Sequence, residues 1–177
     1  LRFRVQKIHN IGPLAELVNL TTLELNNNPL SNLAPLAALV NLTKLNLKSN
    51  RIVDVGTLAA LVNLTYLDLE RNQVVDVAPL ASLVNLEYLD LNSNHIVDVT
   101  SLAPLINLRY LLLRSNQIVD VAPLVSLVNL RRLWVNNNPI VDVSPLAALV
   151  NLSELYCHRG KVPYDLYYDL PGNWRKK

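Results

Sequence analysis

The sequence predicts a solenoid in which short coils stack on one another and each contributes one strand to a single parallel β-sheet. Three observations support this fold class. The apolar positions inside each repeat keep their phase from one copy to the next. No run reaches the roughly 18 apolar residues that would span a membrane, so the 51% hydrophobic content belongs to repeated core positions. The pattern Leu-x-Asn-Leu-x-x-Leu, which leads into the spacing Leu-x-x-Leu-x-Leu-x-x-Asn, recurs every 22 residues, with copies starting at Leu17, Leu39, Leu61, Leu83, Leu105, Leu127 and Leu149.

A fixed interval of roughly 20 to 29 residues with this leucine spacing is typical of the leucine-rich repeat. The sequence therefore predicts a leucine-rich repeat solenoid, a curved right-handed coil with a parallel β-sheet on its concave face and short 3-10 or irregular turns on its convex face. In such an array each coil packs against the coils before and after it, so the repeats together form a single elongated domain. We assign residues 1–157 to the array, whose first repeat is partial and has no recognisable N-terminal cap, and residues 158–177 to a C-terminal cap.

Each expected strand contains two apolar positions two residues apart, and such positions point to the same side of a strand. These side chains are expected to form the core, while the residues between and beside them face outward on the concave side. The expected strands are residues 1–3, 23–25, 45–47, 67–69, 89–91, 111–113, 133–135 and 155–157.

Two rows of asparagine are interpreted as structural. An amide both donates and accepts hydrogen bonds, so it can pair backbone groups where the chain turns. The row that follows the strands contains Asn28, Asn50, Asn72, Asn94, Asn116 and Asn138. The row that precedes them contains Asn19, Asn41, Asn63, Asn85, Asn107, Asn129 and Asn151.

The returning half of each coil reads Ile-Val-Asp-Val-x-Pro-Leu. The proline is expected to start a short 3-10 turn, and the aspartate to accept hydrogen bonds from its backbone. These aspartates are Asp54, Asp76, Asp98, Asp120 and Asp142. The valine directly before the aspartate is interpreted either as partly buried between coils or as an edge for lateral self-association. This valine edge contains Val53, Val75, Val97, Val119 and Val141.

The outward-facing strand positions vary between copies while the framework does not, so they form the candidate binding surface. Five of the ten aromatic residues fall on them. Exposed Tyr, Trp and Arg are enriched at binding hot spots, and a clustered apolar patch rarely lacks a role. The alternative is that neighbouring tyrosines only stack and stiffen the sheet. The predicted partner-binding residues are Tyr66, Asp68, Tyr88, Asp90, Tyr110, Leu112, Arg114, Arg132, Trp134 and Tyr156.

No catalytic site is predicted. His9, His95 and His158 belong to different coils. Cys157 and His158 are adjacent in a strand, so their side chains point to opposite faces. Cys157 holds an inward position, where a cysteine behaves as a small hydrophobic residue.

No metal, cofactor or nucleic-acid site is predicted either. Asp68, Glu70 and Asp90 could attract a cation, but no loop has the ligand spacing of a calcium site. A net charge of +2 without basic clusters does not indicate a nucleic-acid-binding protein.

Over residues 1–157 the repeat resembles that of bacterial internalins. Its consensus is L-V-N-L-x-x-L-x-L-x-x-N-x-I-V-D-V-x-P-L-A-x. The Asp-(Val/Ile)-x-Pro-Leu-Ala segment carries most of this resemblance. It implies a secreted or cell-surface bacterial protein whose concave face grips a host protein. The chain departs from the family in lacking its helical N-terminal cap, in having a short tail where the family has an immunoglobulin-like region, and in its valine edge, where internalins usually have polar residues.

The sequence therefore predicts a non-catalytic module that presents a concave, aromatic-rich surface to a protein partner. The alternative is a structural or designed scaffold without a natural ligand, because near-identical repeats are unusually designable. No membrane insertion is expected. Self-association through the valine edge or the uncapped N-terminal end stays open, and a cytoplasmic or synthetic origin is the alternative to the cell surface.

Overall fold

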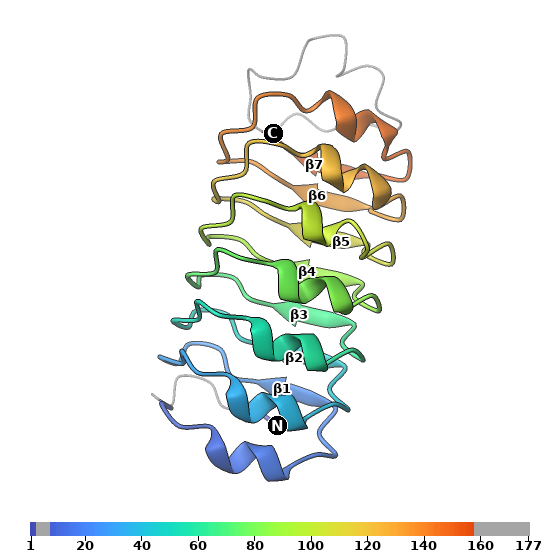
Figure 1. The fold of residues 1–177 in the computed structure, drawn as a ribbon. Coiled ribbons are helices and arrows are strands. Elements are labelled where there is room, and N and C mark those ends of the chain that lie inside the picture. Colours follow the sequence, from blue (N-terminus) through green and yellow to red (C-terminus); the bar gives the residue numbers. More distant parts are fainter. Residues whose placement is uncertain (3–7, 158–177) are drawn as a thin grey trace.

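The computed structural model describes residues 1–2 and 8–157 of the 177-residue chain. The described residues form a stack of similar coils, with the strands on one side and short helices on the other (Figure 1). The predicted C-terminal cap and the last residue of the strand predicted at residues 1–3 lie outside the described residues. The predicted fold class, a leucine-rich repeat solenoid, is confirmed.

Seven strands form one parallel sheet in chain order within the described part. The register is constant, since each strand residue pairs with the residue at the same position of the next repeat, as Leu67 pairs with Leu89. Arg2 bridges to Glu24 without belonging to a named strand. The strands are β1 (Thr22–Glu24), β2 (Lys44–Asn46), β3 (Tyr66–Asp68), β4 (Tyr88–Asp90), β5 (Tyr110–Leu112), β6 (Arg132–Trp134) and β7 (Glu154–Tyr156).

Each of these seven strands begins and ends one residue earlier than predicted. The predicted inward positions are nevertheless correct, because Leu67 and Leu69 are completely buried, as are their counterparts in the neighbouring coils. Leu69 lies just after β3, and its N–H still donates to the carbonyl of Asp90 at 2.8 Å. The extended backbone therefore continues past the end of each three-residue strand.

The convex side carries seven 3-10 helices in the described residues, five of which have proline in their first two positions. The fifth helix is shorter because Pro104 has no N–H, so the i→i−3 bond that would extend the helix cannot form. The helices are η1 (Gly12–Glu16), η2 (Ala34–Ala38), η3 (Gly56–Ala60), η4 (Ala78–Ser82), η5 (Thr100–Leu102), η6 (Ala122–Ser126) and η7 (Ser144–Ala148).

The predicted hydrogen-bonding rows are confirmed. Asp76 Oδ1 accepts from the Ala78 N–H at 2.8 Å, and the other aspartates of that row cap their turns in the same way. Asn85 Nδ2, in the row that precedes the strands, donates to the Val62 carbonyl of the preceding coil at 3.0 Å. These bonds fix the chain where it leaves and enters each 3-10 helix.

A turn in the left-handed region follows each of the strands β1 to β6, and the sequence did not reveal it. Ser49, Arg71 and Ser93 have φ of 55° to 56°, and the corresponding residues of three other coils are similar. Side chains are disfavoured in this region. The backbone N–H of Ser49 donates to the Glu70 carbonyl at 2.7 Å, and this bond to the next coil stabilises the turn.

Candidate partner-binding surface

The first residues of the strands β2 to β6 face outward and form a continuous stack, here called the tyrosine column. Its members are Lys44, Tyr66, Tyr88, Tyr110 and Arg132. The Tyr66 and Tyr88 rings are parallel within 8°, with centroids 4.4 Å apart, and Tyr110 follows at 6.1 Å and 40°. Lys44 Nζ lies 4.7 Å from the Tyr66 centroid, and Arg132 Cζ lies 5.6 Å from that of Tyr110. The parallel register of the strands places these five residues side by side. Cations therefore cover both ends of the column, where cation–π attraction stabilises the rings.

The tyrosines are half-buried, so the column has both a packed edge and an accessible one. Burial raises the pKa of Tyr66 to about 12, and it raises the pKa of Tyr88 as well. Both phenols therefore keep their protons and act as neutral donors at physiological pH. The stacking foreseen as an alternative to binding is present in the structure, and it gives the surface a fixed shape.

The last residue of each of the strands β3, β4 and β5 lies deeper than the sequence suggested. Asp68, Asp90 and Leu112 are on the concave side, but only 6%, 5% and 5% of their surfaces are exposed, so the prediction that they face solvent is wrong. Parallel strands lie only about 4.8 Å apart, so the long side chains of the flanking rows cover the short ones between them. Tyr88 illustrates this cover, since its hydroxyl lies 3.4 Å from Asp90 Oδ2.

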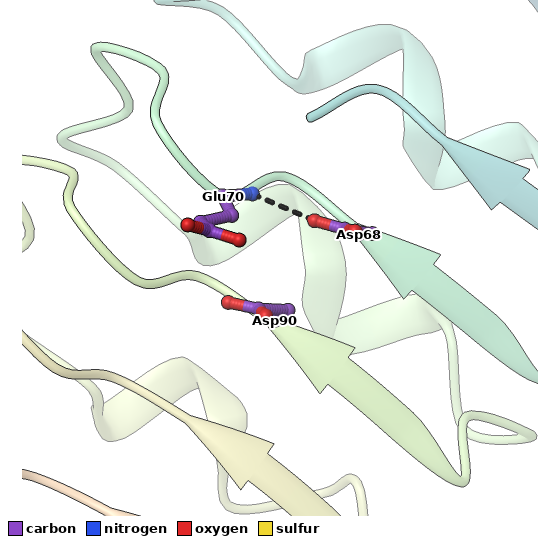
Figure 2. Close-up of side chains that lie close together, drawn as sticks. All are labelled: Asp68, Glu70 and Asp90. Atoms are coloured by element: carbon purple, nitrogen blue, oxygen red, sulfur yellow. Dashed lines mark hydrogen bonds between the residues drawn. The ribbon is translucent and has the colours of Figure 1, made fainter. Parts of the chain in front are cut away.

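Three carboxylates meet on this floor, as Figure 2 shows for Asp68, Glu70 and Asp90. Burial raises the pKa of Asp90 to about 7. The Asn92 N–H, which donates to Asp90 Oδ1 at 2.9 Å, has the opposite and smaller effect on this pKa. Burial also raises the pKa of Asp68. Lys48 forms an ion pair with Glu70, and this hydrogen bond raises the pKa of Lys48.

One oxygen from each of these carboxylates lies within 4.8 Å of the others, the distance range of a shared cation. Calcium, however, takes about six to eight oxygen ligands. Glu70 is already paired with Lys48, and both aspartates accept backbone N–H bonds. We therefore assign this cluster to the floor of the surface, and the absence of a metal site stays a prediction.

The C-terminal end of the sheet presents the most accessible aromatic atoms. Tyr156 is 43% exposed and meets Trp134 edge-on, with centroids 5.3 Å apart. Glu154 joins this pair to the tyrosine column, since its carboxylate accepts from Trp134 Nε1 at 3.1 Å and from Arg132 Nε at 2.6 Å. We call these four residues the C-terminal aromatic cluster. Arg114 lies beside it and is exposed.

The structure thus brings the predicted residues to one face, although at two depths. Tyr66, Tyr88, Tyr110, Trp134, Tyr156, Arg114 and Arg132 have accessible atoms, whereas Asp68, Asp90 and Leu112 form the floor. The predicted partner-binding set omits Lys44 and Glu154, which complete the column and the cluster. Their signal was their position, because both fall in the same outward row as the tyrosines.

The residues considered for catalysis do not form a site among the described residues. Cys157 packs partly against the core, and burial raises the pKa of its thiol. A raised pKa lowers the thiolate fraction that a nucleophile needs. His9 and His95 lie in separate coils, and His158 is outside the described residues.

Sequence-family comparison gives matches over most of the array. The family described as "Leucine Rich repeats (2 copies)" matches residues 40–82, 62–104 and 106–148, and "Leucine Rich Repeat" matches residues 19–38. No curated protein sequence matches the chain.

Solved structures share the fold along nearly the whole chain. An internalin (inlF) from Listeria monocytogenes has 29% identity and a TM-score of 0.90, over 97% of this chain and 52% of its own. Internalin C2 (inlC2) from the same species has 34% identity and a TM-score of 0.90, over 99% of this chain and 80% of its own. A leucine-rich repeat protein of Leptospira interrogans has 26% identity and a TM-score of 0.83, over 93% and 44%. The chain therefore spans about half the length of the inlF chain.

Proposed function

Because the chain belongs to the leucine-rich repeat proteins of the internalin type, we propose that it is a non-catalytic module that binds a protein partner through its concave face. The coarser part of this function, interaction with proteins, is the general role of leucine-rich repeats. The finer part of the proposal concerns which surface makes the contact. We assign contact to the accessible side of the tyrosine column and to the C-terminal aromatic cluster.

The observation that carries the proposal is the continuity of aromatic and cationic groups across six coils, from Lys44 in β2 to Tyr156 in β7. The tyrosine column and the C-terminal aromatic cluster are joined through Arg132, which lies over Tyr110 and donates a hydrogen bond to Glu154. Rigid aromatic groups lose little conformational entropy on binding, since stacking already restricts them. Tyr, Trp and Arg are also the residue types that dominate hot spots.

A structural scaffold without a ligand is the second candidate. The specific observation in its favour is the stack itself, because aromatic pairs stabilise a fold by about 0.5–1.5 kcal/mol beyond their buried area. Stacking of Tyr66 on Tyr88 would then account for the column without any partner.

Localisation follows the same reasoning. The helices of the described part of the chain have three to five residues each and are too short to span a membrane. The internalin relationship supports export to the bacterial surface or medium, while a cytoplasmic or synthetic origin is the alternative. Cell fractionation of the source organism, with an antibody raised against the array, distinguishes them.

Trp134→Ala is expected to weaken partner binding by about 2 kcal/mol or more, the effect of removing a central anchor. Trp134 is half-buried and lies on the surface side of the cluster, so the core leucines keep their packing. The measurement is affinity capture with the intact array from candidate host extracts, followed by titration of each captured protein with wild type and variant.

Gln117→Ala, an exposed residue away from the sheet, serves as the matched control and should bind like wild type. Arg114→Glu should mainly slow association and change its salt dependence, because Arg114 is a rim charge. If Trp134→Ala keeps its fold and binds every captured partner as wild type does, the concave face is not the contact surface. Loss of folding in Trp134→Ala would favour the scaffold.

A further inference from the structure

Two exposed rows of β-branched residues run along the flanks of the solenoid, one on each side of the sheet. The descending ridge lies between the strands and the 3-10 helices, and its side chains are 47% to 71% exposed. Its members are Val53, Val75, Val97, Val119 and Val141. The ascending ridge lies between the 3-10 helices and the next strand, and its side chains are 44% to 62% exposed. Its members are Val18, Val40, Val62, Val84, Ile106, Val128 and Val150.

Single exposed valines are ordinary on a protein surface, but contiguous apolar rows mark interaction sites. The turn chemistry does not require these valines, since the caps and 3-10 helices use the aspartates, prolines and leucines beside them. Each coil contributes one residue to each ridge. Because stacked strands are about 4.8 Å apart, the two ridges have the same step.

The charges beside the two ridges are opposite in the C-terminal half. Asp98, Asp120 and Asp142 follow the descending ridge and are exposed. Each uses Oδ1 to cap its turn, and Asp142 Oδ2 also accepts from the Ser144 hydroxyl at 2.6 Å. Hydrogen bonds from Thr100 lower the pKa of Asp98, so this carboxylate is ionised at neutral pH.

On the ascending side, a groove of about 830 Å³ runs beside the ridge and is lined in part by Arg109 and Arg131. Glu87 lies in the same groove and pairs with Arg109 at 3.5 Å, so Arg131 contributes most of the positive charge. The two arginines are one repeat apart, as are successive aspartates of the other flank.

We propose that the occupant of these flanks is a second copy of this chain, with the descending ridge of one copy packed side by side against the ascending ridge of the other. The shared step lets every coil meet a coil, valine against valine. The aspartate row then faces the groove that contains Arg131. One chain carries both complementary surfaces, which favours a second copy over an unrelated protein.

This contact differs from the concave surface and does not depend on the proposed function. The two surfaces are different, so the pairing is heterologous and can continue from copy to copy. Arg51 and Arg71 lie on the descending side in the earlier coils. They weaken the charge match there, so the C-terminal half is expected to dominate the attraction.

The test uses two blocking variants of the whole chain in analytical ultracentrifugation, from micromolar to millimolar concentration. One variant carries Val75→Lys, Val97→Lys and Val119→Lys, and the other carries Val84→Lys, Ile106→Lys and Val128→Lys. A control adds three lysines to the convex face, at Ala38, Ala60 and Ala148, which are exposed. Circular dichroism melts verify that each variant folds.

Wild type and control are expected to increase in mass with concentration, while each blocking variant alone remains a monomer. An equimolar mixture of the two variants should form a dimer and nothing larger, because one intact descending ridge then meets one intact ascending ridge. A wild type that stays monomeric at millimolar concentration would overturn the proposal. Dimers of either blocking variant alone would also overturn it, since they require like ridges to pair.

The charge contribution is tested by replacing Asp98, Asp120 and Asp142 with asparagine. Asn10 and Asn32 already cap the first two turns through Oδ1, at 2.8 and 2.9 Å, so these changes keep the backbone cap while they remove the charge and the second acceptor oxygen. The neutralised variant is expected to associate more weakly than wild type and with less salt dependence. Association that is equally strong and equally salt-sensitive would overturn the assigned pairing of charges.

Discussion

Replacing Asn94 with alanine is expected to lower the free energy of unfolding by about 2–3 kcal/mol, the cost of leaving a buried backbone donor unpaired together with the lost bonds. Asn94 is 4% exposed and connects two coils. Its Nδ2 donates to the Leu69 and Leu91 carbonyls, both at 3.0 Å, and its Oδ1 accepts from the Val74 N–H at 3.0 Å. Chemical denaturation followed by circular dichroism gives the measurement.

The individual bonds explain why the loss has this size. The Leu69 carbonyl also accepts from Asn72, and the Leu91 carbonyl also accepts from Asn116, so each keeps a donor in the variant. The buried Val74 N–H loses the Asn94 acceptor. Asn94→Asp retains an acceptor there but loses the Nδ2 donor, and it adds a buried charge, so it should not rescue stability.

Asn28→Ala is the matched control near the end of the array, where the corresponding Oδ1 accepts from the partly buried Ile8 N–H at 3.0 Å. A smaller loss is expected there, because fewer coils depend on that junction. An Asn94→Ala variant that unfolds at the same denaturant concentration as wild type would show that water replaces the amide.

Asp90→Asn is expected to stabilise the protein above neutral pH by about 1–3 kcal/mol, since a pKa shift of one unit corresponds to about 1.4 kcal/mol. Burial raises the pKa of Asp90 to about 7, whereas its ordinary value is 3.8. Below the ordinary pKa both states are protonated, and the residue has no effect on the pH dependence. Between the two values the folded state binds the proton more tightly, so wild type loses stability as pH rises through this window.

The chain itself provides the precedent for this substitution. Asn46 occupies the same position in β2, and its Oδ1 accepts from the Lys48 N–H at 3.0 Å, as Asp90 Oδ1 accepts from Asn92. The variant therefore retains the local bond and loses the buried charge, and its Nδ2 replaces the oxygen that faces the Tyr88 hydroxyl. Denaturation at pH 4, 6 and 8 should show a difference between variant and wild type that grows with pH, over the range set by these two pKa values.

Asp98→Asn is the control, because the pKa of Asp98 is shifted in the opposite direction from that of Asp90. Hydrogen bonds from Thr100 lower the pKa of Asp98, and its ionised form is the one that caps the turn. No gain at pH 8 is expected for this variant. If Asp90→Asn were no more stable than wild type at pH 8, the floor of the surface would have to be hydrated enough to hold the charge.

The sequence by itself determined the framework, because in a solenoid the contacts between coils recur at a fixed separation along the chain. A leucine repeated every 22 residues must meet its own counterpart, as Leu67 meets Leu89. The role of Asn94 follows for the same reason, since a polar amide at every inner turn must satisfy backbone groups. The aspartate caps needed only local spacing.

Only the tertiary structure decided how deep each side chain lies and what it touches. Alternation along a strand assigned Asp90 to the concave side but did not reveal its burial, which depends on the size of the flanking side chains. The bond from Trp134 to Glu154 joins residues on neighbouring strands through rotamers that periodicity does not specify. A repeat determines which residues are neighbours, whereas exposure, pKa and stacking depend on how those neighbours fill the space between them.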